Sequence, residues 1–167
     1  EKLANHPSLL KAVVAHVPFV TVLDTMLDGD LPLTPGEFKE WGNQRDEHYF
    51  DYMRSYCPYE NCGFVKDHLL KGAGNTFPSI FATSGLTDYR VGYYEAAKWV
   101  ARIRAGIAAA KAEAPEGAAI GEPLLVFETN MAAGFSLIGV VRGCVLVVGP
   151  AFGGFLVNPA ENFGGVF

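Results

Sequence analysis

The chain lacks the features by which several classes of protein function are recognised. Its 13 Lys and Arg residues form no dense block and its formal net charge is −5, so the sequence argues against nucleic acid as a partner. Its three cysteines include no Cys-x-x-Cys pair and its four histidines have no ligand-like spacing, so we expect no metal and no cofactor. A basic-then-apolar leader is also missing from Glu1 onward. We therefore interpret the cysteines as reduced thiols and expect a cytoplasmic protein.

Three apolar stretches are present that are typical of strands buried on both faces of a sheet. They are Leu9–Val22, in which Pro18 ends regular pairing, then Phe77–Thr83 and Leu124–Thr129. A helix is predicted between the second and third stretches. This order predicts a right-handed crossover and an α/β fold with a mainly parallel sheet flanked by helices.

The predicted helix, Tyr93–Lys111, has a clear apolar face. Its members recur at steps of three and four: Tyr93, Ala96, Val100, Ile103, Ile107 and Ala110. The charged residues Glu95, Lys98, Arg102 and Lys111 fall outside this face. A second helix is predicted at Arg45–Tyr56, and Gly- or Pro-rich segments are predicted as loops. The predicted loops are Asp28–Gly36, Asn61–Gly74 and Ala114–Pro123.

From Phe135 onward the chain is apolar and rich in glycine, with Arg142 the single charge before Val157. The length of this run approaches that of a membrane span. However, a central charge and the Gly149-Pro150 pair argue against a membrane helix, so we expect a buried strand or an unstructured tail and no membrane partner.

The loop after the second apolar stretch carries two residues suited to catalysis, Asp88 and Arg90. Asp88 could orient and charge-stabilise a catalytic histidine; alternatively it caps the next helix or closes a turn. Arg90 could bind a substrate carbonyl or carboxylate through its planar guanidinium; alternatively it forms an ordinary surface ion pair.

The partners that Asp88 would need in a serine hydrolase are absent from the chain. In α/β-hydrolases the catalytic order is Ser, then Asp or Glu, then His, yet all the histidines precede Asp88. They are His6, His16, His48 and His68, of which His16 is interpreted as a core residue. No Gly-x-Ser-x-Gly elbow occurs, and the segment around Ser136 has the wrong spacing.

A third candidate site residue, Glu37, lies in the acidic and aromatic segment Pro35–Gly42. A carboxylate beside a pocket could select a cationic substrate side chain through charge-assisted hydrogen bonds. Alternatively, Glu37 belongs to a solvated helix start.

Several segments together resemble the catalytic domain of the prolyl oligopeptidase family, and its oligopeptidase B branch most closely. In the first half they are Lys11-Ala-Val-Val-Ala-His-Val-Pro-Phe-Val20, Thr25-Met-Leu-Asp28, Pro32-Leu-Thr-Pro-Gly-Glu-Phe-Lys-Glu-Trp-Gly-Asn43 and Tyr52-Met-Arg-Ser-Tyr-Cys-Pro-Tyr59. They continue with Thr83-Ser-Gly-Leu-Thr-Asp-Tyr-Arg-Val91, Glu95-Ala-Ala-Lys-Trp-Val-Ala101 and Thr129-Asn-Met-Ala-Ala-Gly134. The match is ordered along the chain, which makes it specific.

The resemblance implies a partial α/β-hydrolase fold at residues 1–134 that belongs beneath a β-propeller and cleaves short peptides. It implies that Asp88 is the triad acid, that Arg90 holds a substrate carbonyl, and that Glu37 lines a pocket for Arg or Lys side chains. It also implies that the Ser nucleophile lies upstream of Glu1, together with the propeller.

The sequence departs from the family pattern at three places. Phe135 follows Gly134 where the family has Gly-His, and residues 135–167 do not match, which suits the hypothesis of a shifted reading frame or exon error. Lys39 replaces an acidic residue, and Cys57 stands where Ser is usual.

We therefore expect the C-terminal part of a serine oligopeptidase that cleaves after Arg or Lys, inactive when isolated because Ser and His are missing. Two alternatives remain. One is a catalytically dead, hydrolase-like binding domain, and the other is a membrane-tethered protein anchored through residues 135–157.

Overall fold

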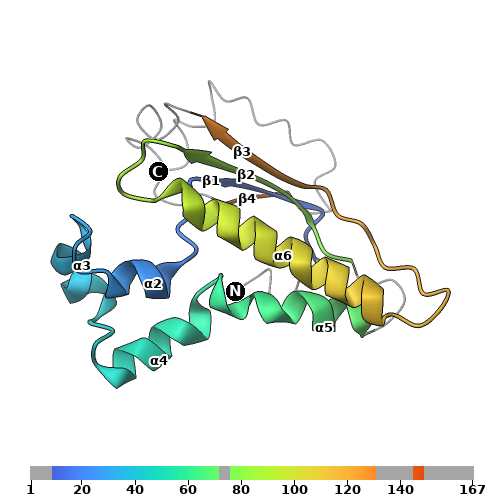
Figure 1. Ribbon diagram of the computed structural model, residues 1–167, viewed down its shortest axis with the longest axis horizontal. Helices are drawn as coiled ribbons and strands as arrows, with labels where there is room; N and C mark the ends of the chain where they lie inside the picture. The colour runs from blue at the N-terminus through green and yellow to red at the C-terminus, as the bar shows by residue number, and fades with distance from the viewer. Residues whose placement is uncertain (1–8, 72–75, 131–144, 149–167) are drawn as a thin grey trace.

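A computed structural model of the protein describes residues 9–71, 76–130 and 145–148. Within this part the chain forms one sheet in the order β3-β2-β1-β4 (Figure 1). The strands are β1 (Ala12–His16), β2 (Ser79–Gly85), β3 (Leu125–Asn130) and β4 (Val145–Val148). β1, β2 and β3 are mutually parallel, and β4 runs antiparallel to β1. The predicted mainly parallel α/β fold is therefore confirmed.

The long helix α6 (Tyr93–Glu113) joins β2 to β3 and packs against both strands. It ends at Ala114, whose backbone is extended, because the following Pro115 disfavours a helical conformation for the residue before it. Figure 1 shows α6 along one face of the sheet. Its apolar residues bury against the inward-facing side chains of β1 and β2, namely Val13, Ala15, Ile80 and Ala82. This burial fixes the helix, and with it the loop before the helix, on the sheet.

Four short helices and a 3₁₀ turn occupy the connection between β1 and β2. They are α2 (Val22–Leu27), α3 (Thr34–Trp41), α4 (Glu47–Tyr56), η2 (Glu60–Gly63) and α5 (Phe64–Leu70). α5 packs along α6, whereas α2 and α4 share a second, smaller core around Met26 and Met53. The predicted helix at Arg45–Tyr56 is confirmed with a later start, because the Asp46 side chain accepts the His48 N–H at 2.9 Å and caps the first turn.

Two of the predicted loops are partly helical. The segment Asn61–Gly74 contains α5, whose Val65 and Leu69 are buried four residues apart. That spacing is an amphipathic signal, and the flanking glycines obscured it. The end of Asp28–Gly36 is the first turn of α3, where Pro35 is tolerated because the first amides of a helix have no partner within it.

The predicted strand boundaries and faces also need correction. Only Ala12–His16 of the first apolar stretch is strand, because Pro18 interrupts it and Val22 starts α2. The strands are not buried on both faces: in β1 burial alternates, and in β3 Val126 is 36% exposed. Among the described helices, α6 covers one face, and on the other face Val14 and Phe81 are only partly buried.

The predicted tail, residues 135–167, lies outside the described residues except for β4. Those four residues form a strand paired with β1. No helix in the described part of the chain is long and apolar enough to cross a membrane.

Candidate functional site

The parallel strands β1, β2 and β3 bring their carboxyl ends to one edge of the sheet, where loops leave for α2 and α6 (Figure 1). At this edge His16 pairs in register with Thr83, and Gly85 with Asn130. Polar groups on such loops are held by the rigid sheet while remaining accessible, which suits catalysis.

Asp88 occupies a tight turn just after β2. Its N–H donates to the Gly85 carbonyl at 3.2 Å, and its Oδ1 accepts the N–H groups of Arg90 and Val91 at 2.9 and 3.2 Å. Oδ2 is buried and has no hydrogen-bond partner among the described residues. Asp88 therefore closes a turn, which is one of the two alternatives to a catalytic role. It does not cap the next helix, because the N-cap residue of α6 is Gly92. Its second oxygen can accept a further donor. An unsatisfied buried acceptor costs about 1–3 kcal/mol, so a donor that reached this oxygen would form a favourable hydrogen bond.

Arg90 lies beside Asp88 on the same turn, with an exposed side chain. Its Nε donates to the Tyr89 hydroxyl at 3.3 Å, and its Cζ lies 5.5 Å from the centroid of that ring. Arg90 forms no ion pair with the described residues, so the predicted alternative of a surface ion pair is absent from this part of the chain. The guanidinium is held by a neutral partner and keeps donors for a carbonyl or carboxylate.

Glu37 lies apart from these two residues, in the first turn of α3. It is half-buried, and none of the hydrogen bonds or ion pairs among the described residues joins it to Asp88 or Arg90. Figure 1 shows α3 beyond α2, on the side toward which the parallel strands point. The structure therefore brings Asp88 and Arg90 into direct contact, through the Arg90 N–H and Asp88 Oδ1. It does not bring Glu37 into contact with either residue.

The described histidines do not complete a triad. His16 Nδ1 lies 2.7 Å from Thr83 Oγ1, His48 is in the first turn of α4, and His68 Nε2 lies 3.2 Å from the Thr76 carbonyl. None of them contacts Asp88 in the part of the chain that the structure describes.

The two described cysteines are buried and free. Cys57 Sγ donates to the Val20 carbonyl at 3.5 Å and Cys62 Sγ to the Pro58 carbonyl at 3.2 Å. Burial raises the pKa of Cys62 to about 11, so its thiol stays protonated and unreactive near neutral pH. In the described ranges no cluster of His, Cys, Asp or Glu could hold a metal ion.

The burial of Glu95, near this edge of the sheet, differs from what its sequence position predicts. Glu95 is predicted to lie outside the apolar face of the helix, yet it is fully buried and accepts three hydrogen bonds from the segment after β1. Tyr93, assigned to the buried face, is 42% exposed. The spacing in the sequence carried a signal for this burial, since Glu95 and Trp99 are four residues apart and share one face of the helix. Trp99 is buried on that face.

Comparison with known proteins gives a consistent picture. The sequence model described as the prolyl oligopeptidase family matches residues 2–115. The chain is 42% identical over 126 residues to Protease 2 of Moraxella lacunata, covering 75% of this chain and 15% of that protein. It is 38% identical over 128 residues to dipeptidyl aminopeptidase BI of Pseudoxanthomonas mexicana, covering 77% and 15%.

Among solved structures, oligopeptidase B from Leishmania major superimposes with a TM-score of 0.58 at 35% identity, covering 77% of this chain and 15% of that one. The resemblance inferred from the sequence is thus confirmed, and so is the α/β-hydrolase character of the fold. The chain spans about 15% of the length of these relatives.

Proposed function

This chain belongs to the prolyl oligopeptidase family, and we propose that it forms the C-terminal part of the hydrolase domain of a serine oligopeptidase. The observation that carries the proposal is the half-satisfied carboxylate of Asp88: one oxygen is fixed by two backbone amides and the other is buried without a partner in the described residues. A triad acid needs this arrangement, because it must be held still while offering an acceptor to the imidazole N–H.

In the proposed mechanism a serine hydroxyl from the longer protein attacks the peptide carbonyl, and a histidine from outside residues 1–167 takes the hydroxyl proton, since no histidine of this chain follows Asp88. Asp88 Oδ2 accepts the other ring N–H of that histidine and stabilises the imidazolium. The histidine then donates its proton to the leaving amine, and water hydrolyses the acyl-enzyme. Arg90, free of carboxylate partners in the described part of the chain, donates to a substrate backbone carbonyl.

We propose that Glu37 binds the Arg or Lys side chain of the substrate, so that the enzyme cleaves after these residues. The Glu37 side chain is half-buried and makes no ion pair with the described residues, so it is available to a cationic substrate. Lys39 departs from the family pattern, but residues two apart on a helix do not face each other. Lys39 therefore does not neutralise Glu37 directly.

We propose that the rest of the longer protein contains a β-propeller and an upstream segment of the hydrolase domain, which carries the catalytic serine. This agrees with the small share of its relatives that the chain covers. We place the boundary of the hydrolase part at Gly134 and the protein in the cytoplasm, which fractionation of cells would check.

The function is tested with the longest natural protein that contains this chain, assayed on fluorogenic peptides ending in Arg or in a neutral residue. We expect hydrolysis of the Arg peptide, and none by the isolated 167-residue chain. Glu37→Gln should raise KM for the Arg peptide about tenfold and leave the neutral peptide unchanged, because a charge-assisted hydrogen bond is lost. Glu40→Gln, exposed on the same helix, is the matched control.

A catalytically dead binding domain is the second candidate, favoured by the absence of a histidine after Asp88. A serine-directed covalent probe separates the two. Failure of the longer protein to react with the probe or to cleave either peptide would contradict the enzymatic proposal.

A further inference from the structure

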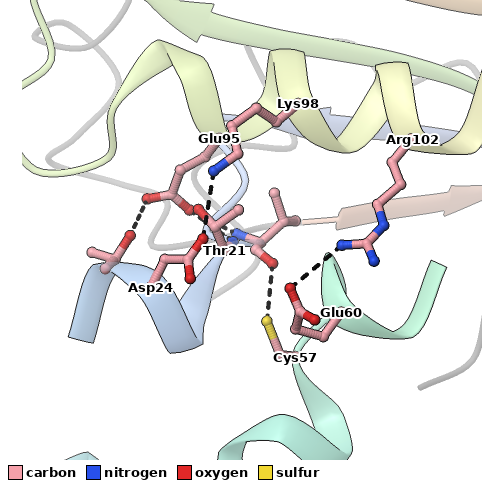
Figure 2. A network of polar contacts seen from close by, with 9 residues as sticks. Thr21, Asp24, Cys57, Glu60, Glu95, Lys98 and Arg102 are labelled. Carbon is pink, nitrogen blue, oxygen red and sulfur yellow. Dashed lines mark hydrogen bonds and ion pairs between the residues drawn. The ribbon is translucent and has the colours of Figure 1, made fainter. Parts of the chain in front are cut away.

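Both carboxylate oxygens of the buried Glu95 accept hydrogen bonds near the carboxyl edge of the sheet (Figure 2). Its relative exposure is 0%. Oε2 accepts the N–H groups of Val20 and Thr21, each at 3.0 Å, and Oε1 accepts the Thr25 hydroxyl at 3.0 Å. These donors lie 70 to 75 residues away in sequence, so the carboxylate is a long-range connection between the segment after β1 and α6.

Basic residues nearby do not account for this burial. Lys98 Nζ pairs with Asp24 at 3.5 Å and Arg102 with Glu60 at 3.4 Å (Figure 2). Glu95 is therefore held by neutral, directional donors. Burying a carboxylate is costly unless its oxygens are hydrogen-bonded, and in some proteins such groups fix the relative placement of the segments that they join.

The segment that Glu95 holds leaves β1 through a strained turn. Val17 has φ +45°, which is rare for a β-branched residue, and its N–H donates to the Thr83 carbonyl at 2.8 Å. Such a conformation persists only where the surrounding structure over-determines it. The bonds from Glu95 to Val20 and Thr21 provide a second restraint directly after it.

Glu95 is also connected to Asp88 through the chain. It lies in the first turn of α6 and its N–H donates to the Gly92 carbonyl at 3.0 Å. The turn held by Asp88 Oδ1 ends at Val91, one residue before Gly92. The start of α6 thus forms one end of the Asp88 turn, and the other end is the tip of β2.

We propose that Glu95 is a positioning residue for Asp88. By fastening the first turn of α6 to the segment after β1, it sets the place and direction of the Asp88 carboxylate relative to the ends of the parallel strands. The consequence for catalysis rests on the proposed function, whereas the coupling between the two segments does not.

The coupling is tested by hydrogen–deuterium exchange of the longest natural protein, read by mass spectrometry. In Glu95→Ala, peptides covering residues 17–21 and 86–92 should both exchange on the order of tenfold faster, because two backbone amides lose their acceptor and the helix start loosens. Glu95→Gln keeps an acceptor for both amides and should restore near-native exchange at both segments. Thr25→Val removes one hydrogen bond and should give a smaller change in the same direction.

The matched control is Lys98→Gln, which removes an exposed contact between α6 and α2 without touching Glu95. It should leave residues 86–92 unchanged. The proposal is overturned if Glu95→Ala speeds exchange at 17–21 and leaves 86–92 at the native rate, or if Lys98→Gln has the same effect as Glu95→Ala.

Kinetics supply the second readout. In Glu95→Ala, kcat on the Arg peptide should fall at least about tenfold with KM changed less than about twofold, since small displacements of a catalytic group reduce rate more than binding. Rescue of kcat by Glu95→Gln is expected, and its absence would contradict a positioning role. If no peptide is cleaved at all, the proposed function fails while the exchange experiment still decides the coupling.

Discussion

Two carboxylates seven residues apart, Asp88 and Glu95, differ in how their oxygens are satisfied. Both oxygens of Glu95 are used within the chain, and all three donors come from a distant segment. Asp88 uses one oxygen for its own turn and leaves the other buried without a partner in the described residues. Glu95 therefore links two distant segments, whereas Asp88 keeps one oxygen without a hydrogen-bond partner among the described residues.

The largest expected effect concerns Asp88. Asp88→Asn should lower kcat of the longer protein about 10⁴-fold, because an amide can favour the wrong histidine tautomer, while stability changes by less than about 1 kcal/mol. Peptide hydrolysis and denaturant unfolding measure the two quantities. Asp46→Asn, at a comparable turn-closing aspartate that caps α4, should leave activity intact. Equal losses in both variants would show that Asp88 only closes a turn.

The second effect concerns Glu95, whose substitution should change stability more than that of Asp88. Glu95→Ala should lower the free energy of unfolding by about 2–4 kcal/mol, because buried amides lose their acceptor. The shift of the unfolding midpoint in urea measures this. Asp51→Ala, which removes an exposed ion pair with Arg54, should cost well under about 1 kcal/mol. A Glu95→Ala effect no greater than that of the control would mean that its hydrogen bonds do not stabilise the fold.

The third effect concerns Cys62, which is buried in the core that α6 forms with the sheet and α5. The Cys62 thiol has its pKa raised from 9.0 to about 11 by burial, with the nearby Arg102 opposing that shift. Between these values the unfolded chain loses the thiol proton and the folded chain keeps it, so stability falls as pH rises. The loss should be on the order of 2 kcal/mol.

Unfolding in urea at pH 8, 9, 10 and 11 measures that slope, with Cys62→Ala as the comparison. The variant should show a shallower decline over this range, because the other titrating groups are unchanged. Identical slopes in the two proteins would contradict a desolvated thiol.

The smallest effect concerns the exposed side of the Asp88 turn. Tyr89→Phe removes the hydroxyl that accepts from Arg90 Nε and keeps the ring beside the guanidinium. We expect KM to rise about two- to threefold with kcat nearly constant, since one exposed hydrogen bond contributes little. Steady-state kinetics on the Arg peptide check this, and a kcat loss larger than the KM change would place Tyr89 in the chemistry itself.

The comparison between the two carboxylates also shows what could be predicted. The alternation of apolar stretches with a periodic helix predicted β2, α6 and β3, because local periodicity reflects burial against one partner. The loop between the second apolar stretch and the predicted helix indicated Asp88 and Arg90, because loops at strand ends hold polar groups rigidly and accessibly. α5 was missed since its short apolar pattern lies between glycines, and the exposure of Val126 depends on which neighbours cover the sheet.

The sequence by itself determined the α/β class, the family and the position of the Asp88 loop, because these depend on local patterns and on ordered motifs. Only the tertiary structure decided the burial and the hydrogen-bond partners of the two carboxylates. Whether Glu95 is buried, and which of the two Asp88 oxygens is satisfied, depends on whether the fold brings donors to them, as it does for Glu95 from the segment after β1 and from α2. Hydrogen bonds between segments distant in sequence follow from packing, and no local periodicity encodes them.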